Sequence, residues 1–316
     1  MLQDTTARLS PPVRRDHVFA VVGQSHAARV RAQLPWLGRG NLLVEPIGRN
    51  TVAAIALAAL RLARRAPGSV MVVLPADHAI PDRAAFRADL VYAFELTCDT
   101  DALVTFGIPP TRPETGYGYI KPAADIDDGQ QRSAWVARFV EKPDQLRAEA
   151  MLADGHLWNA GIFVWRVEVI LEALRTYVPE VLREFERALT RGGADALARA
   201  YRRVPAVSID TAVLERASRV AVVRARFAWS DVGSWAALGE LWAGSGSENA
   251  VRGRVLAVDS RGCIVDSPRR LVALLGVEDL VVVDAGDAVL VCRKDRAQDV
   301  RRVVEALRSR GLGRYL

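Results

Sequence analysis

The order of apolar and polar residues along the first two-thirds of the 316-residue chain predicts strands that alternate with helices. The continuous apolar run at 70–75 is typical of a central strand that is buried on both faces. The alanine- and leucine-rich stretch at 51–65 has the length and composition of a helix. The predicted strands cover 17–23, 70–75 and 103–108, and the predicted helices cover 51–65 and 84–96. This order predicts an α/β fold: a Rossmann-like sheet with helices on both faces and ligands at the carboxyl ends of its strands.

The pattern becomes less regular in the middle of the chain and changes again near its end. Strands are predicted at 135–143 and 161–167, and helices at 144–153, 168–176 and 179–190. The Gly/Ser-rich stretch 243–250 marks a domain boundary between residues 1–243 and residues 250–316. Short apolar runs follow this boundary, and a helical pattern begins at Asp295. The second domain is therefore expected to be small and β-rich, and to end in a helix.

Composition narrows the class of protein. Half of the residues are apolar and a quarter are charged, as in soluble globular proteins, and no apolar run is long enough for a membrane span. The formal net charge is +6, but the arginines are scattered without a basic stripe, which favours small anionic ligands over nucleic acid. The N-terminus lacks the features of a signal peptide. The sequence has three cysteines, Cys98, Cys263 and Cys292. They are too far apart along the chain for a disulfide framework or a zinc knuckle, which favours a reduced cytoplasmic setting.

Two acidic residues are candidates for a metal site. Asp77 follows the apolar run at 70–75, so it is expected at the carboxyl edge of the sheet. A carboxylate there suits Mg²⁺, which takes one or two carboxylates together with water and substrate phosphates. Asp231, in the segment WSDVGSW, is a candidate second ligand for the same ion. Taken alone, Asp77 also fits a helix N-cap, and Asp231 also fits an ordinary turn.

The segment FVEKP at 139–143 places an acid and a lysine side by side at a predicted strand end. Only three lysines occur among many arginines, so a specific role is expected for the lysine at 142. A compact ammonium such as that of Lys142 suits a phosphate, and Glu141 can accept hydrogen bonds from sugar hydroxyls. A solvated ion pair at a strand end explains the same two residues equally well.

Three further segments contain residues suited to small polar ligands. In TRPETGYGYIK, Gly116 and Gly118 would let the backbone approach a ligand, and Tyr117 or Tyr119 could stack on it or form a hydrogen bond with it. A hairpin turn gives the same pattern. In WNAG, Asn159 offers amide donors and acceptors for a sugar hydroxyl, and it equally suits a turn. EPIGRNT precedes a helix whose first N–H groups suit an anion, and Asn50 also fits a simple cap of that helix.

Taken in order, these segments resemble the mannose-1-phosphate guanylyltransferase family of sugar-phosphate nucleotidyltransferases. The resemblance runs through EPIGRNT, LPADH, TFGI with PTRPETGYGYI, FVEKP, LWNAGIFVW, SIDTAVLE and FAWSDVGSW. It implies a nucleotidyltransferase domain, often in a homodimer, that uses Mg²⁺ to convert GTP and mannose 1-phosphate into GDP-mannose and pyrophosphate. The resemblance assigns catalysis to Lys142, Asp77 and Asp231, and it makes the two aspartates the ligands of the metal. It assigns binding of the sugar to Glu141, Asn159, Gly116, Tyr117 and Gly118. It assigns binding of the nucleotide to Glu45, Arg49 and Asn50.

The first residues depart from the family pattern. The family opens with a strand and a loop of the type G-G-x-G-[ST]-R-L-x-P-L-S, and neither occurs in the 316 residues. MLQDTTARLSPPV resembles the helix that follows that loop, so a front segment is expected to be missing from the sequence. The strands beside the absent strand would lack a ladder partner, and the polypeptide is expected to have little or no transferase activity.

Other functions remain open on the residues alone. A non-catalytic relative that binds the sugar nucleotide or acts as a regulatory subunit fits the same segments, and so does a preference for another base or sugar. A nicotinamide-dependent dehydrogenase is disfavoured because no G-x-G-x-x-G follows any predicted strand.

Overall fold

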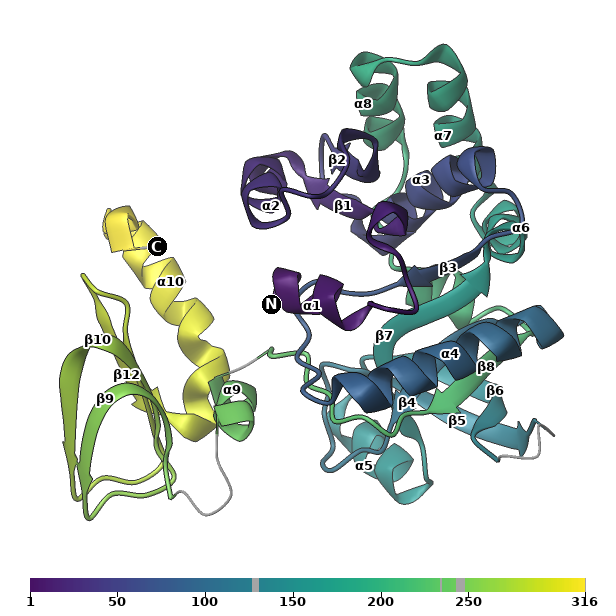
Figure 1. Cartoon of the computed structure of the whole chain (residues 1–316). Coiled ribbons are helices and arrows are strands. Elements are labelled where there is room, and N and C mark those ends of the chain that lie inside the picture. The colour runs from purple at the N-terminus through teal and green to yellow at the C-terminus, as the bar shows by residue number, and fades with distance from the viewer. Residues whose placement is uncertain (127–130, 234, 243–247, 316) are drawn as a thin grey trace. The chain divides into compact units, whose positions relative to one another are not determined.

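The computed structural model describes residues 1–126, 131–233, 235–242 and 248–315 (Figure 1). The chain forms two compact units, Met1–Trp229 and Ser230–Leu316. No helix in the described part of the chain is long and apolar enough to cross a membrane.

A six-stranded mixed sheet lies at the centre of the first unit, with the strand order β3-β7-β4-β8-β6-β5. Its strands are β3 (Val70–Val73), β4 (Leu103–Ile108), β5 (Gly118–Asp125), β6 (Ser133–Glu141), β7 (Leu157–Arg166) and β8 (Val220–Arg224). β4 is parallel to β8, and β7 is antiparallel to both β3 and β4. Every residue of β4 is buried, as its uninterrupted apolar run predicts.

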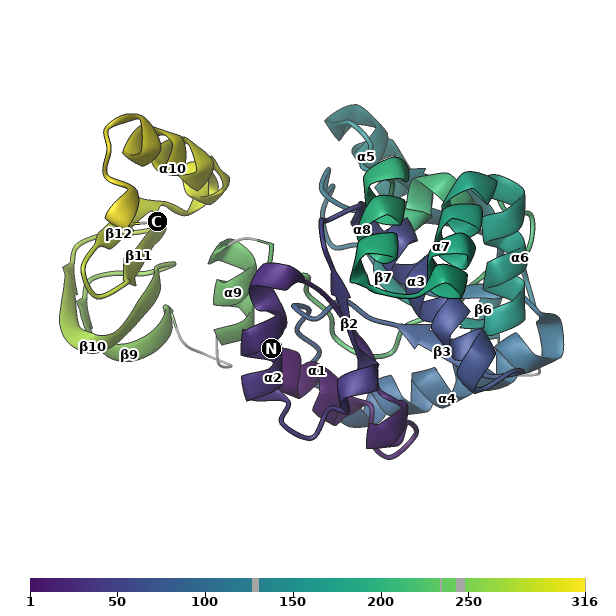
Figure 2. The same ribbon diagram turned by 90° about the horizontal axis from the view of Figure 1, so that it is seen from above.

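Helices cover both faces of this sheet, which confirms the predicted fold class (Figures 1 and 2). Alternate residues of β8 show the two faces: Val220 and Val222 belong to one hydrophobic cluster, and Ala221 and Val223 to the other. The helices of this unit are α1 (Leu2–Arg8), α2 (Ala27–Gln33), α3 (Asn50–Arg65), α4 (Arg83–Thr100), α5 (Gln145–Ala153), α6 (Val167–Tyr177), α7 (Pro179–Arg191) and α8 (Ala194–Arg203). The first cluster contains residues of α3, α6, α7 and α8, and the second contains residues of α4 and α5.

Two strands of the first unit form a separate sheet. β1 (Ala20–Gly23) and β2 (Leu42–Glu45) are parallel and pair with each other. Among the described residues, β1 has β2 as its one ladder partner and β3 has β7 as its one ladder partner. All four residues of β1 are half-buried, whereas a strand inside a sheet would be buried on both sides.

Most of the elements predicted for the first unit are present within a few residues of their expected bounds. The elements α2, β2, β5 and α8 are not predicted. β5 has three buried residues and then meets Lys121 and Pro122, which interrupt the strand pattern. α8 buries Ala196, Ala200 and Tyr201, and two small alanines give only a weak apolar periodicity.

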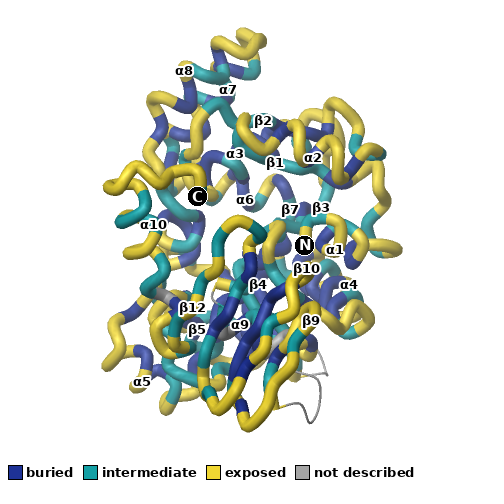
Figure 3. The backbone as a smooth tube through the Cα atoms, turned by 90° about the vertical axis from the view of Figure 1, so that its left-hand side faces the viewer, coloured by how far each residue is buried: buried dark blue, intermediate teal, exposed yellow. Residues whose placement is uncertain are grey.

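The second unit is β-rich and ends in a helix, as predicted. Its sheet has the order β12-β11-β10-β9, formed by β9 (Ala250–Val258), β10 (Ile264–Leu275), β11 (Leu280–Asp284) and β12 (Val289–Arg293). The runs predicted as two strands at 262–267 and 271–277 form the single strand β10, because its pairing with β9 continues through a register shift between Ser267 and Leu271. The terminal helix α10 (Val300–Ser309) has no buried residue (Figure 3).

The helix α9 (Trp235–Trp242) belongs to the second unit. Trp235 and Trp242 pack on a cluster that contains Ala250, Ile264 and Val281. The boundary predicted from the Gly/Ser-rich stretch assigns this helix to the first domain instead, and residues 243–247 of that stretch lie outside the described residues.

Candidate functional site

The segments TRPETGYGYIK and FVEKP meet where β5 begins and β6 ends. Gly118 is paired with Glu141 across the two antiparallel strands, and the Lys142 amide donates to the Tyr117 carbonyl oxygen (3.1 Å). A Cβ atom added at Gly118 would lie 2.7 Å from Glu141 Oε2. Glycine at 118 therefore leaves room for the Glu141 carboxylate beside the backbone, whereas Gly116 is exposed in the turn before β5.

Lys142 has an unusual backbone conformation. Its φ is +47°, in the left-handed region that non-glycine residues rarely occupy. Its Nζ lies 3.2 Å from Glu141 Oε1, and the two side chains are 64% and 18% exposed. Strain of this kind tends to be kept where function requires a particular side-chain direction. Lys142 directly follows the last residue of β6, and its ammonium lies beside the carboxylate of Glu141, the residue that precedes it.

Asn159 lies on β7 in a buried hydrogen-bond network. Its Oδ1 accepts from Thr105 Oγ1 (2.9 Å) and from the Gly161 amide (3.2 Å), and its Nδ2 donates to Asp210 Oδ1 (2.9 Å). Asn159 is a buried polar residue, with 8% of its surface exposed. This position is next to Trp158, which pairs with Tyr119 of β5, so Asn159 lies beside the β5 and β6 ends.

Asp210 is a site residue that the residue-level reasoning missed. It begins the π-helix η4 (Asp210–Leu214), a rare element that often occurs at functional sites. Burial, and next the negative charge of Glu141, raise the pKa of the Asp210 carboxyl to about 6. Asp210 lies in the segment SIDTAVLE, which the sequence analysis used only as part of the family resemblance. We call Gly118, Glu141, Lys142, Asn159 and Asp210 the five-residue cluster.

The segment LPADH lies beside WNAG. Gly161 has a φ of +65°, and a Cβ atom there would lie 3.7 Å from both Pro75 and His78. His78 Nδ1 accepts from Trp229 Nε1 (3.1 Å), so the neutral ring carries its proton on Nε2. The ring of Tyr117 lies 5.2 Å from that of Trp229, in an edge-on arrangement. These contacts place the end of FAW and the GYG turn next to the LPADH segment.

The two predicted metal ligands lie in different units. Asp77 is an exposed residue in the bend that follows β3. Asp231 belongs to the second unit, where its Oδ1 accepts from the Gly233 amide (3.0 Å), as an aspartate does in a turn. Among the described residues, no three His, Cys, Asp or Glu side chains gather as a metal site. An Mg²⁺ ion held by two carboxylates, water and phosphate oxygens needs no such group.

Arg49 and Glu45, predicted to bind the nucleotide, both contact α8. Arg49 Nε donates to the Tyr201 carbonyl oxygen (2.7 Å) and Nη2 to that of Arg202 (3.2 Å), which satisfies two carbonyls at the end of α8. Burial raises the pKa of the Glu45 carboxyl, and burial together with Glu45 raises the pKa of the Tyr201 phenol. Both side chains therefore have contacts that hold the protein together.

The start of α3 is joined to the chain that precedes η4. Asn50 Oδ1 accepts from the Thr51 amide (2.8 Å), and the Val52 amide donates to the Val207 carbonyl oxygen (3.3 Å). Thr51 Oγ1 accepts from the Ile209 amide (2.8 Å). Two of the first N–H groups of this helix, which were expected to be open to an anion, therefore donate within the protein.

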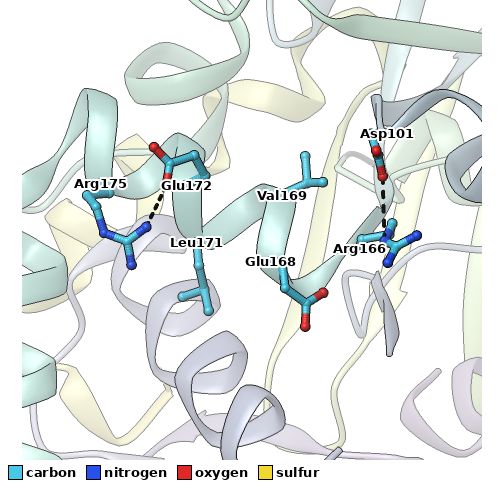
Figure 4. Close-up of a pocket in the computed structure, with 7 residues that line it drawn as sticks. All are labelled: Asp101, Arg166, Glu168, Val169, Leu171, Glu172 and Arg175. Atoms are coloured by element: carbon cyan, nitrogen blue, oxygen red, sulfur yellow. Dashed lines mark hydrogen bonds and ion pairs between the residues drawn. The ribbon is translucent and has the colours of Figure 1, made fainter. Parts of the chain in front are cut away.

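A cavity of about 530 Å³ lies elsewhere in the first unit, at the start of α6 (Figure 4). Arg166 Nε lies 3.5 Å from Asp101 Oδ1, and Arg175 Nη1 lies 2.5 Å from Glu172 Oε2, so acids balance the bases around it. The lining residues are Asp101, Arg166, Glu168, Val169, Leu171, Glu172 and Arg175. None of them belongs to the five-residue cluster or to a segment of the family resemblance.

Comparison with known proteins covers both units. Residues 1–245 match the family model described as "Nucleotidyl transferase", and residues 253–307 match "MannoseP isomerase/GMP-like beta-helix domain". A "Mannose-1-phosphate guanylyltransferase" of Escherichia coli is 40% identical over 98% of this chain and 67% of its own length. The "Alginate biosynthesis protein AlgA" of Pseudomonas aeruginosa is 39% identical over 94% of this chain and 61% of its own length.

A solved structure extends the match to the fold. A Thermus thermophilus protein described as a mannose-1-phosphate geranyltransferase superposes with a TM-score of 0.88 and 35% identity, over 97% of this chain and 89% of that one. The chain thus spans about two-thirds of the E. coli relative, less of the P. aeruginosa one, and most of the solved one. The order of the sequence segments, the sheet that brings most of them together and these matches agree, and the chain belongs to the mannose-1-phosphate guanylyltransferase family of nucleotidyl transferases.

Proposed function

We propose that this protein transfers GMP from GTP to mannose 1-phosphate and releases GDP-mannose and pyrophosphate. The observation that carries the proposal is the five-residue cluster, which combines an exposed ammonium, two carboxylates and an amide in the first unit. Relatives at about 40% identity that bear the name of this activity support the same substrates.

The chemistry needs positioning and charge neutralisation more than proton transfer. A sugar phosphate has a second pKa of about 6, so its oxygen is already ionised at neutral pH and attacks without a general base. The new bond joins this oxygen to the α-phosphorus of GTP, and the bond between the α-phosphorus and the bridging oxygen of the β-phosphate breaks. Lys142 offers a point charge for the phosphate, and Glu141 accepts from sugar hydroxyls while it holds the Lys142 ammonium at 3.2 Å.

We propose Asp77 and, independently, Asp231 as residues that bind Mg²⁺. Asp77 is exposed and follows a strand end, and carboxylate oxygens are the donors that Mg²⁺ prefers. The ion, when bound, would neutralise charge on the transferring phosphates. Loss of magnesium-dependent turnover in both Asp77→Ala and Asp231→Ala, with sugar phosphate binding retained, would support the assignment, and full turnover in either variant would contradict it.

For the nucleotide we propose the segment 45–51. Because Arg49 and two of the first N–H groups of α3 donate inside the protein, the groups of this segment proposed for a base are the Asn50 amide and the Glu45 carboxylate, which also contacts Tyr201. A carboxylate can accept from the N–H groups on the edge of guanine.

We further propose that the 316-residue polypeptide turns over slowly, because it contains no G-G-x-G-[ST]-R segment to donate backbone N–H groups to the triphosphate. Pyrophosphate release would be measured for this polypeptide and for one extended at its N-terminus with the glycine-rich strand and loop of the family. We expect turnover at least tenfold higher in the extended chain, and equal turnover would contradict this part of the proposal. Binding of mannose 1-phosphate without turnover in either chain would favour the second candidate, a sugar-nucleotide-binding relative that is not an enzyme.

We propose a homodimer in which the outer face of β9 and β10 meets a second copy. Leu256, Val258, Leu271 and Leu275 are 55%, 44%, 67% and 73% exposed. Val258 pairs with Leu275 across the two strands, so the apolar side chains lie on one face. Light scattering after size-exclusion chromatography tests this, since Leu271→Glu with Leu275→Glu should convert the dimer to a monomer; a monomeric unaltered chain would contradict it.

We also propose a reduced cytoplasmic setting. All three cysteines are free, and Cys263 is buried in the hydrophobic cluster of the second unit. Fractionation of cells that express the protein would test this.

A further inference from the structure

One segment of the first unit touches both halves of the predicted sugar site. Residues 207–215 include η4, whose first residue, Asp210, accepts from Asn159 of WNAG. At the other end of the segment, Glu215 Oε1 accepts from the Glu141 amide of FVEKP (2.9 Å). The segment thus fixes the position of a side chain on β7 and of a backbone group at the end of β6.

The hydrogen bonds of Asn159 determine which way its amide points. The Gly161 amide can only donate, so the atom that faces it is the oxygen. An ionised Asp210 can only accept, so the atom that faces it is the nitrogen. Two partners of fixed character therefore exclude the flipped amide, even though the hydroxyl of Thr105 would tolerate either atom.

A count of donors and acceptors then defines what Asn159 offers to a ligand. Both lone pairs of Oδ1 are used, by Thr105 and Gly161, and one of the two Nδ2 hydrogens is used by Asp210. In the part of the chain that the structure describes, one N–H of this amide is left over. Asn159 can therefore donate to a sugar hydroxyl oxygen but cannot accept from one, and the proposed acceptor of this site is the carboxylate of Glu141.

The Asp210 carboxylate is costly to keep at this place. It is half-buried and Glu141 repels it, and the compensation comes from a backbone hydrogen bond, from Asn159 and from the more distant Lys142 ammonium. A neutral acceptor would hold the Asn159 amide with less desolvation. The retention of an acid here indicates a task beyond packing.

We infer that Asp210 is a positioning residue for the sugar phosphate: it holds Asn159 so that the amide presents a single N–H, and no acceptor, to a sugar hydroxyl. This rests on the proposed function, because it takes the five-residue cluster as the sugar site. It deepens that function by assigning the direction of each hydrogen bond to the sugar: donation from Asn159, and acceptance by Glu141.

Titration calorimetry of the 316-residue chain with mannose 1-phosphate tests the inference, because binding does not require turnover. Asp210→Ala should weaken binding about tenfold, since a hydrogen bond that involves a charged group is lost. Asp210→Asn keeps an acceptor oxygen for Asn159 and should bind within about threefold of the unaltered chain. Thr211→Ala, which alters the same π-helix at a side chain that pairs with Ser208, is the matched control and should change binding less than twofold.

A swapped pair separates positioning from simple structural support. In Asn159→Asp with Asp210→Asn, the new amide donates to the new carboxylate, so the buried hydrogen bond is kept while the ligand-facing N–H is lost. We expect a Tm within a few degrees of the unaltered chain and binding at least tenfold weaker.

Binding by the swapped pair equal to that of the unaltered chain, or unchanged binding in Asp210→Ala, would overturn the inference and leave the proposed function standing. Normal binding without turnover in the extended chain would overturn the proposed reaction alone. An unaltered chain that binds no mannose 1-phosphate would overturn both.

Discussion

The proposed sugar side and the proposed nucleotide side of the first unit are built in contrasting ways. On the sugar side, Lys142 and Glu141 keep charged groups near one another at the end of β6, and Asn159 has one N–H without a partner among the described residues. On the nucleotide side, Arg49 and the first amides of α3 already donate to the protein itself. The sugar half is thus organised in advance for a ligand, while the residues of 45–51 mainly hold α3 against α8 and the chain before η4.

The largest expected effect is at the centre of the sugar side. Lys142→Ala removes the point charge for the phosphate, and kcat/KM of the upstream-extended chain should fall about 10²–10³-fold. Lys121→Ala is the control, since this lysine pairs with Asp154 (2.9 Å) outside the five-residue cluster, and it should change kcat/KM less than threefold. A loss in Lys142→Ala no greater than in the control would remove the sugar side from the mechanism.

Asp210→Asn should change how stability depends on pH. The pKa of Asp210 is raised from 3.8 to about 6 in the folded protein, so the folded state binds this proton more tightly than the unfolded state does. The resulting stabilisation is complete below about pH 4 and is lost as the pH rises through about 6. The group should lower the free energy of unfolding by up to roughly 3 kcal/mol across this range, and Asp210→Asn should abolish that fall.

Urea denaturation between about pH 4 and pH 7 measures this difference. The same pH slope in both proteins would show that Asp210 is not the titrating group, and would weaken the view that the sugar side stores an unfavourable charge.

Gly118→Ala tests the close packing at the β5–β6 end. The added Cβ would lie 2.7 Å from Glu141 Oε2 and 3.3 Å from the buried Phe139 ring, so the carboxylate and the ring both have to move, at a cost of about 1–3 kcal/mol in stability and a severalfold loss of sugar phosphate affinity. Gly116→Ala is a matched control, because its Cβ would meet only the flexible Glu114 carboxylate, at 3.3 Å. Calorimetry and thermal unfolding of the two variants should differ clearly; similar results would mean that the Gly118 contact is unimportant.

Arg49→Ala has the smallest expected effect and tests the nucleotide side. It removes two hydrogen bonds to the end of α8 and should lower stability by about 1–2 kcal/mol while leaving the KM for GTP within threefold. A KM increase of tenfold or more without loss of stability would show that Arg49 binds the nucleotide, and the contrast between the two sides would then disappear.

Sequence patterns predicted the parts of the fold that depend on long apolar periods. The helix at 51–65 and the strand at 103–108 match α3 and β4 almost residue for residue, because each buries most of its length. The single strand β10 and the membership of α9 were not predicted, because pairing across a register shift and packing onto a distant sheet leave no local pattern.

The candidate site was predictable in its residue types but not in its hydrogen bonds. Glu141, Lys142 and Asn159 stood out because of their chemistry beside strand ends. Asp210 did not, because an acid at the start of a short helical segment looks like a common cap, and only the fold brings it to Asn159. The bond of the Val52 amide at the start of α3 was equally hidden, since its partner, the Val207 carbonyl oxygen, is distant in the sequence.

The separation of β1 and β2 from the six-stranded sheet should be visible in the rate at which backbone hydrogens are replaced by deuterium. In a parallel or antiparallel ladder, successive amides of a strand point to opposite sides, so one partner protects every second amide. Within the described chain, β1 and β3 have one partner each, and slow and fast exchange should therefore alternate along Ala20–Gly23 and Val70–Val73. Uniformly slow exchange on both strands would mean that another backbone segment forms hydrogen bonds along their open edges.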